Sequence, residues 1–146
     1  MPHNLGDEPP VKTYLFVCVH NAGRSQMAAA FFNLYADPAR CEAVSAGTQP
    51  ADHVHPAVVQ VMREIGIDLS SRRPCKLTDN LAKRASLLVT MGCGESCPMI
   101  PGLRVVEWNL PDPKGRSLDD VRAIRDDIHE KIKCLIKSEC SECCAV

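Results

Sequence analysis

The sequence predicts an α/β protein: a single three-layer domain with a four-stranded parallel sheet flanked by helices. Two observations support this prediction. Apolar runs typical of buried strands alternate with segments whose apolar residues recur at helical spacing, a pattern that favours a parallel sheet. The chain has 146 residues, of which 45% are hydrophobic and 24% charged, and this length and composition fit one soluble globular domain.

The predicted elements follow one another in the order strand, helix, strand, helix, helix, strand, strand, helix. Strands are predicted over residues 14–19, 42–45, 86–90 and 104–108, and helices over residues 25–35, 56–66, 78–84 and 118–135. Pro56 suits the first position of its helix, and Gly66 suits the end of it. Thr78 is a candidate N-cap, while Ser117 and Asp120 form a capping box before the last helix.

Composition excludes several classes of function. The formal net charge is −1, so the chain has no basic surplus for binding nucleic acid. No apolar run is long enough to span a membrane, and residues 1–10 are polar and contain prolines, which is unlike a signal peptide. Nine cysteines make an odd number, which suits a reducing cytoplasm and thiol chemistry better than a secreted disulfide framework.

The segment after the first predicted strand has the residues that an anion-binding nucleophile loop requires. Backbone amides between Cys18 and Arg24 can surround an anion, and the positive end of the following helix reinforces them. The guanidinium of Arg24 suits a tetrahedral oxyanion, and the same field favours a thiolate at Cys18, to which Ser25 can donate a hydrogen bond. The residues expected to bind the substrate are Val19, His20, Asn21, Ala22, Gly23, Arg24 and Ser25.

The same residues could instead have purely structural roles. A cysteine at the end of a strand is usually a packing residue, Asn21 has a structural role by default, and a solvent-facing His20 needs no task. The order of strand, glycine-containing loop and helix favours the functional interpretation of Cys18 and Arg24.

Asp112 is the best candidate for a general acid. It follows the fourth predicted strand, where a parallel sheet places its ligand-binding edge, and Pro113 stiffens its backbone. Taken alone, Asp-Pro is a common turn dipeptide. In combination with the cysteine loop, the catalytic interpretation is favoured.

A second group of cysteines follows the third predicted strand. A thiol at Cys93 or Cys97 could attack an adduct on Cys18 and form a disulfide. A zinc site made with Cys140 and Cys143, or thiols without a function, are the alternatives. We expect a flexible tail at residues 1–10, a domain at 11–137 and a cysteine-rich tail at 138–146; the sequence does not separate a function of the tail's thiols, with Cys144 among them, from chance.

At residues 12–137 the sequence resembles an arsenate reductase with the low-molecular-weight tyrosine phosphatase fold. The residues that carry this resemblance are Cys18 to Arg24 with Ser25-Gln26-Met27-Ala28, Ser45-Ala46-Gly47-Thr48, His55-Pro56, residues 66–70 and 89–94, Cys97-Pro98 and Asp112-Pro113. The resemblance implies that arsenate binds in the loop, that Cys18 attacks arsenic while Asp112 assists departure of oxygen, and that a second thiol releases arsenite as a disulfide forms.

The resemblance leaves the source of that second thiol open. In the thioredoxin-coupled branch two further cysteines complete the relay, and Cys93 and Cys97 occupy that segment here. In an actinobacterial-like branch, an external thiol such as mycothiol, or glutathione with a glutaredoxin-like partner, makes the second attack. No tightly bound cofactor and no metal are expected.

The sequence departs from the family pattern at two places. Many relatives have a second cysteine directly before the arginine, where this chain has Gly23. Some relatives bind potassium beside the loop; Asn21, Ser45 and Asp68 match that set, but Ala29 stands in place of the helix acid, so a potassium requirement is not carried over.

Two other functions compete with arsenate reduction. A low-molecular-weight protein tyrosine phosphatase would hydrolyse a phospho-cysteine formed on Cys18. Phosphatases of this kind tend to have aromatic residues after the Asp-Pro, whereas Lys114 and Gly115 follow it here, which disfavours flat phosphotyrosine. A non-enzymatic protein that binds metals or metalloids through its thiols is the third class.

Overall fold

The computed structural model describes residues 11–92 and 100–139, and all structural statements below refer to these residues. The elements are β1 (Lys12–Cys18), α1 (Arg24–Tyr35), β2 (Cys41–Gly47), α2 (Pro56–Arg63), α3 (Asp79–Arg84), β3 (Leu87–Thr90), β4 (Val105–Glu107) and α4 (Leu118–Glu139). None of the described helices is long and apolar enough to span a membrane.

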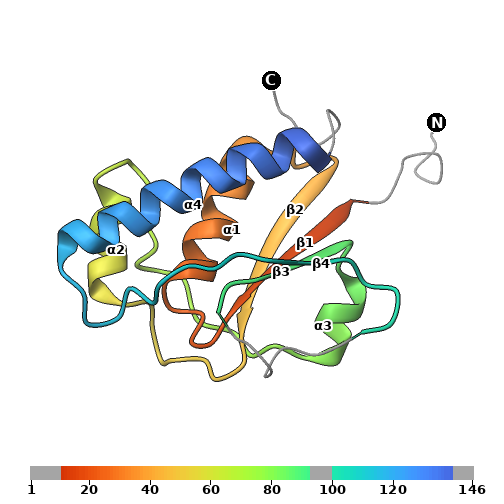
Figure 1. Ribbon diagram of the computed structural model, residues 1–146, viewed down its shortest axis with the longest axis horizontal. Coiled ribbons are helices and arrows are strands. Elements are labelled where there is room, and N and C mark those ends of the chain that lie inside the picture. The colour runs from red at the N-terminus through yellow and green to blue at the C-terminus, as the bar shows by residue number, and fades with distance from the viewer. Residues whose placement is uncertain (1–10, 93–99, 140–146) are drawn as a thin grey trace.

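The four strands form one parallel sheet in the order β2-β1-β3-β4, as the sequence predicted (Figure 1). β1 is central and buried along nearly its whole length, which is why its sequence is continuously apolar from Tyr14 to Cys18. Strand ends differ from the prediction by up to two residues. Lys12 and Thr13 are polar, yet they extend β1 because they pair with Cys41 and Glu42 of β2, and the Thr13 hydroxyl donates to the Glu42 carboxylate over 3.2 Å.

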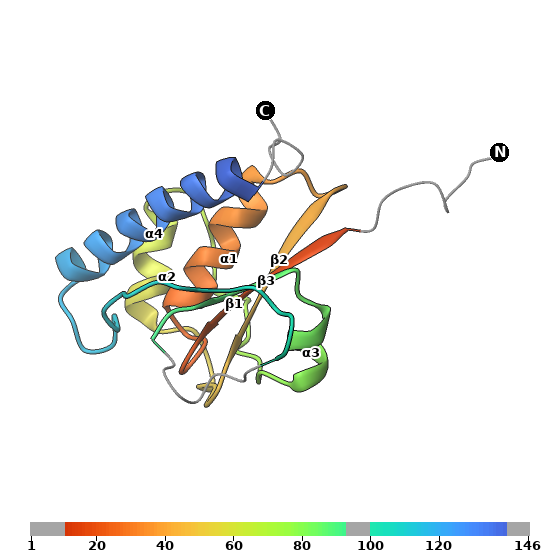
Figure 2. The ribbon, with the colours of Figure 1, turned by 45° about the vertical axis from the view of Figure 1, so that its right-hand side comes forward.

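Helices cover both faces of the sheet, with α1, α2 and α4 on one face and α3 on the other (Figures 1 and 2). Side chains of β1 alternate between these layers. Tyr14 and Phe16 are buried in the large core under α1, α2 and α4. Leu15 and Val17 lie in a smaller cluster with Ala82 of α3. A central strand with consecutive apolar residues from Tyr14 to Cys18 therefore contributes to two cores at once.

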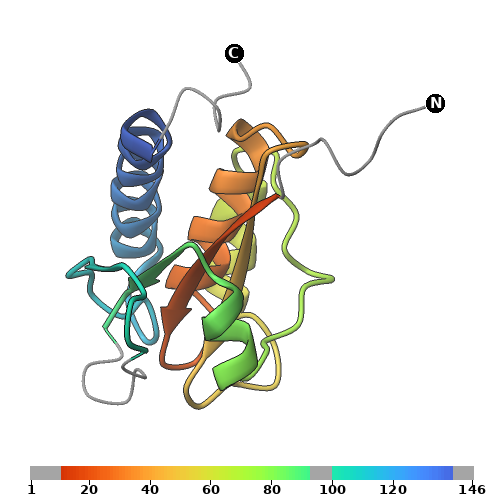
Figure 3. The ribbon, with the colours of Figure 1, turned by 90° about the vertical axis from the view of Figure 1, so that its right-hand side faces the viewer.

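The long helix α4 packs against α1 and α2 (Figure 3). Its buried side chains recur at helical spacing: Val121, Ile124, Ile128, Ile132, Leu135 and Ile136. His129 stacks on Phe31 of α1 with ring centroids 4.4 Å apart, and Arg125 donates to the Val61 carbonyl of α2 over 2.9 Å. Near its end, Glu139 forms a 2.7 Å ion pair with Arg104. The helix thus continues through Glu139, two residues beyond the expected domain end.

Two predicted helix caps are present. The Thr78 hydroxyl oxygen accepts from the Leu81 amide over 3.1 Å at the start of α3. The Ser117 hydroxyl oxygen accepts from the Asp120 amide, also over 3.1 Å, at the start of α4. These bonds fix where both helices begin. In contrast, α1 begins after Gly23 with no side-chain cap, so its first amides are not occupied by a side chain of the described residues.

Candidate active site

The loop between β1 and α1 lies at the carboxyl edge of the sheet. Cys18 ends β1 opposite Gly47, and Val17 pairs with Thr90 at the end of β3, so three strands end beside the loop. This edge is where parallel α/β sheets bind their ligands. Cys18 is 2% exposed, which excludes water from most of its surface.

The carbonyl oxygens of the loop all accept hydrogen bonds that hold them in place. Thr48, Gln49, Ala51 and His55 donate backbone amides to the carbonyls of Cys18, Val19, His20 and Ala22, over 3.3, 2.8, 3.0 and 2.9 Å. The Gln26 side chain donates to the Asn21 carbonyl over 3.1 Å, and the Met27 amide to the Gly23 carbonyl over 3.0 Å. The amides of residues 19–23 donate to no described residue. They are therefore available to an anion.

Asn21 determines which way the Ser25 hydroxyl points. Its Oδ1 accepts from the Cys75 amide over 2.8 Å and from Gln26 Nε2 over 3.2 Å, so its Nδ2 must face Ser25, to which it donates over 2.7 Å. The Ser25 oxygen is thereby occupied as an acceptor. Its own hydrogen is left to donate to the sulfur of Cys18, 2.9 Å away. A hydroxyl donor aimed at the sulfur stabilises the thiolate over the thiol.

The backbone of Asn21 has a φ of 50°, in the left-handed region that asparagine tolerates better than most residues. Asn21 therefore shapes the loop and orients Ser25, while its part in binding the substrate stays a prediction. No role was expected for Gln26, whose side-chain amide donates to Asn21 twice and to the Arg73 carbonyl over 3.4 Å. A glutamine in the first turn of a helix has no sequence signal for such a role.

Arg24 is buried, with 6% of its surface exposed, although it carries a full charge. Its Nη1 donates to the Leu110 carbonyl over 3.2 Å, and its Nη2 lies 3.9 Å from the Asp112 carboxylate. Its Nε has no hydrogen-bond partner among the described residues. Buried polar groups are nearly always paired, so an orphaned guanidinium donor beside the loop points to an anionic ligand.

The structure brings Asp112 to the same place from the loop after β4. Its Oδ1 accepts from the Lys114 amide over 3.0 Å, and its side chain is 42% exposed. Pro113 packs on the cysteine loop so closely that a Cβ at Gly23 would lie 2.7 Å from Pro113 Cγ. This contact explains the departure at Gly23, because a cysteine there would displace the segment that holds Asp112.

Two histidines lie at the mouth of the loop. The rings of His20 and His55 meet edge to face, with centroids 6.4 Å apart. Burial lowers the pKa of His55, and the charges of His20, Lys114 and His53 lower it further while Asp112 opposes them. His55 is consequently neutral at pH 7. The sequence identified His55 only as the residue that opens α2.

Two of the three residues that match the potassium-binding set already have other partners in the structure. Asn21 Oδ1 is already occupied by two N–H donors. Asp68 accepts from the Ser70 amide over 2.9 Å and pairs with Arg63 at 3.4 Å, so its bonds are made elsewhere. Within residues 11–92 and 100–139, no three histidine, cysteine or acidic side chains are grouped to hold a metal.

Cys93 and Cys97, the expected resolving thiols, lie outside the described residues, as do Cys140, Cys143 and Cys144. Their roles therefore stay predictions. Residues that the structure does bring together are Cys18, Arg24, Ser25 and Asp112, from the loop and first turn after β1 and the segment after β4.

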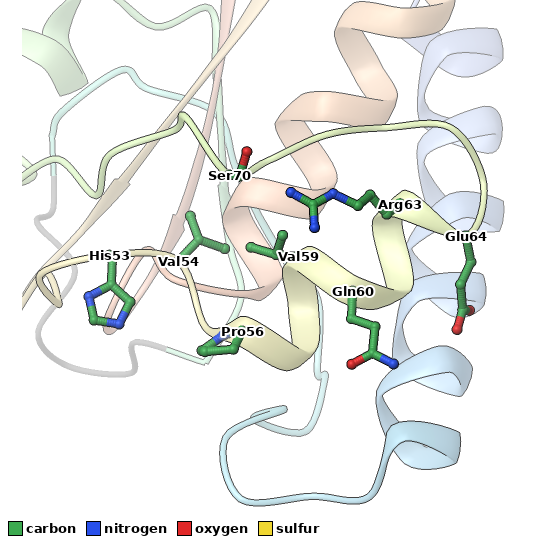
Figure 4. Close-up of a pocket in the computed structure, with 8 residues that line it drawn as sticks. All are labelled: His53, Val54, Pro56, Val59, Gln60, Arg63, Glu64 and Ser70. Atoms are coloured by element: carbon green, nitrogen blue, oxygen red, sulfur yellow. The ribbon is translucent and has the colours of Figure 1, made fainter.

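A surface cavity of about 770 Å³ lies beside α2 (Figure 4). Its walls come from α2 and from the segments before and after it, with His53, Val59, Arg63 and Ser70 among the lining residues. None of the four grouped residues lines this cavity. This cavity therefore does not mark the candidate active site.

This parallel fold and cysteine loop define the class of protein. The chain belongs to the low molecular weight phosphotyrosine protein phosphatase family, whose model matches residues 13–142. Its similarity is to members named arsenate reductase. A Halobacterium salinarum protein named "Putative arsenate reductase" is 41% identical over 121 residues, which is 80% of this chain and 85% of the relative.

Solved structures agree in fold. A thioredoxin-dependent arsenate reductase of Corynebacterium glutamicum has 40% sequence identity and a TM-score of 0.77; the match covers 88% of this chain and 62% of that longer one. An arsenate reductase solved in its oxidized state has 30% identity and a TM-score of 0.77, with 88% and 98% of the two chains covered.

Proposed function

We propose that this protein reduces arsenate to arsenite, with Cys18 as the nucleophile. The single observation that supports this most is the grouping of a buried sulfur, a hydroxyl donor 2.9 Å from it and an arginine whose Nε has no described partner. A tetrahedral oxyanion would accept from that Nε and from the amides of the loop. The names of the relatives identify the oxyanion as arsenate.

The reaction that these residues support has two chemical steps. The Cys18 thiolate attacks arsenic and forms an S–As bond, and an oxygen of arsenate leaves as water after Asp112 supplies a proton. A second thiolate then attacks the Cys18 sulfur. An S–S bond forms, the electron pair of the S–As bond goes to arsenic, and As(V) becomes As(III). Two thiols are oxidised to one disulfide for each arsenite released.

We infer that Cys93 or Cys97 supplies the second thiol and that a thioredoxin-type protein restores the reduced state. The dependence of the Corynebacterium relative on thioredoxin supports this donor over mycothiol or glutathione. Such recycling suits the reducing cytoplasm, where the product would then be handled as part of arsenic detoxification.

The test is a comparison of electron donors. Arsenate-dependent oxidation of NADPH is measured with thioredoxin and its reductase, and separately with mycothiol or glutathione systems, against Cys18→Ser as the control. Turnover with thioredoxin, abolished by Cys18→Ser, is expected. Hydrolysis of a phosphotyrosine substrate is measured in parallel, and phosphatase activity without arsenate turnover by any donor would replace this proposal with the phosphatase alternative.

The second thiol needs its own experiment. After one turnover with arsenate, the protein is quenched with acid and its disulfides are mapped by mass spectrometry. A bond between Cys18 and Cys93 or Cys97 is expected. Cys18 joined to a small thiol, with both other cysteines free, would show that the attack comes from outside the chain.

A further inference from the structure

Gly92, two residues beyond the end of β3, lies against the guanidinium of Arg24. Its φ is 96°, and a Cβ built on it would lie 2.4 Å from Arg24 Nη1 and 3.4 Å from Cζ. Real Cβ atoms essentially never approach another heavy atom within 3.0 Å. We infer that Gly92 is a positioning residue: its missing side chain is what allows Arg24 to present its free donor to an oxyanion.

The guanidinium is also held by the segment after β4. Nη1 donates to the Leu110 carbonyl over 3.2 Å, and Nη2 faces Asp112 at 3.9 Å. Nη1 thus contacts both Gly92 and Leu110, and Nε is left without a described partner. Because a guanidinium is planar and rigid, these two contacts on its Nη atoms also determine where Nε points.

A side chain at position 92 would move this group. Nη1 would have to retreat by at least 0.6 Å, the difference between 2.4 and 3.0 Å. Arg24 is a flexible side chain, so it would yield before the backbone does, and the bond to Leu110 and the direction of Nε would change together. A charge-assisted hydrogen bond depends on alignment, so affinity for a tetrahedral anion falls.

The sulfur is supported independently of this contact. Cys18 is held by Ser25, and Ser25 by Asn21, and no described hydrogen bond links these residues to Gly92. An alanine at position 92 should thus weaken capture of the anion while the loop keeps its fold. This inference rests on the proposed role of Arg24 as the oxyanion-binding residue.

The experiment uses the full chain and inorganic phosphate as the probe. Phosphate bound in the loop protects Cys18 from iodoacetamide, so the protection curve gives a dissociation constant, and the rate without phosphate checks that the loop is folded. Gly92→Ala is compared with Gly66→Ala and Gly102→Ala. These controls have φ values of 85° and 82° with nothing within 4 Å of the added Cβ, so they carry the same backbone strain without the contact.

We expect Gly92→Ala to raise the phosphate dissociation constant by about tenfold or more, while both controls stay close to the wild type. Equal dissociation constants for Gly92→Ala and the controls would overturn the inference. If the wild-type protein itself shows no protection by phosphate, the proposed function fails first, and the two failures are distinguishable.

A double-mutant cycle covers the case in which Gly92→Ala folds poorly. Arg24→Lys lacks the Nη1 atom that the new Cβ would meet, so adding Gly92→Ala to it should change phosphate affinity little beyond the effect of Arg24→Lys alone. A cost of the alanine that is the same in both backgrounds, measured at a temperature where all four proteins are folded, would refute the contact as the cause.

Discussion

Replacing Ser25 by alanine tests the hydrogen bond on which the reactivity of Cys18 depends. Ser25 is fully buried and its oxygen lies 2.9 Å from the sulfur, while Asn21 fixes the direction of the hydroxyl hydrogen. A hydrogen bond to a charged group contributes about 1.5–3 kcal/mol. Since each 1.4 kcal/mol is a factor of ten, the rate at which Cys18 is alkylated should fall about ten- to hundredfold.

The assay is the rate of alkylation by iodoacetamide at pH 7, followed at the Cys18 peptide by mass spectrometry because the chain has nine cysteines. Ser71→Ala, at an exposed serine with no described side-chain hydrogen bond, is the matched control and should react like the wild type. An unchanged rate in Ser25→Ala would refute the assignment of the hydroxyl as the donor that stabilises the thiolate.

Three further predictions concern the acid, the fold and its dependence on pH. Asp112→Asn should lower kcat for arsenate by about 10²- to 10⁴-fold in the coupled NADPH assay, and full activity would exclude Asp112 as the acid. Ile128→Ala, in the fully buried face of α4, should reduce the free energy of unfolding in urea by about 2–5 kcal/mol. A loss well below that range would contradict this prediction and would mean that neighbouring side chains fill the space left by Ile128. The hydrogen bond from Arg104 holds the pKa of Glu139 below its ordinary value, so the stability from this pair is present above pH 4.5 and is lost as pH falls through the lowered pKa. Glu139→Gln should flatten that part of the acid-side stability curve, and an unaltered curve would contradict it.

Local patterns were sufficient to predict the parts of the fold that local chemistry decides. The apolar run of β1, the caps at Thr78 and Ser117, and the cysteine loop before α1 each depend on residues close together in sequence. Strand ends were less predictable, because Lys12 belongs to β1 through its pairing with Cys41, which lies in another part of the chain.

The same distinction applies to the candidate site. Cys18, Arg24 and Ser25 fall within one short segment, so their chemistry could be read together. Gly92 contacts Arg24 from the segment after β3, and the Cys75 amide reaches Asn21 from the segment before α3. Nothing in the residue types at those positions indicates the contacts, which arise only when the strands are set side by side.

The fixed carbonyls of the cysteine loop have a consequence for selectivity. Because every one of them accepts a hydrogen bond from another segment or from α1, the loop amides are in place before an anion binds. They therefore select an anion by its geometry and charge alone. Arsenate and phosphate are alike in both respects, so these amides admit both. Discrimination must then come after capture, from the readiness of an arsenic–sulfur bond to give its electrons to arsenic, which phosphorus does not share. In a cell rich in phosphate, turnover would follow the proportion of the two ions rather than the amount of arsenate.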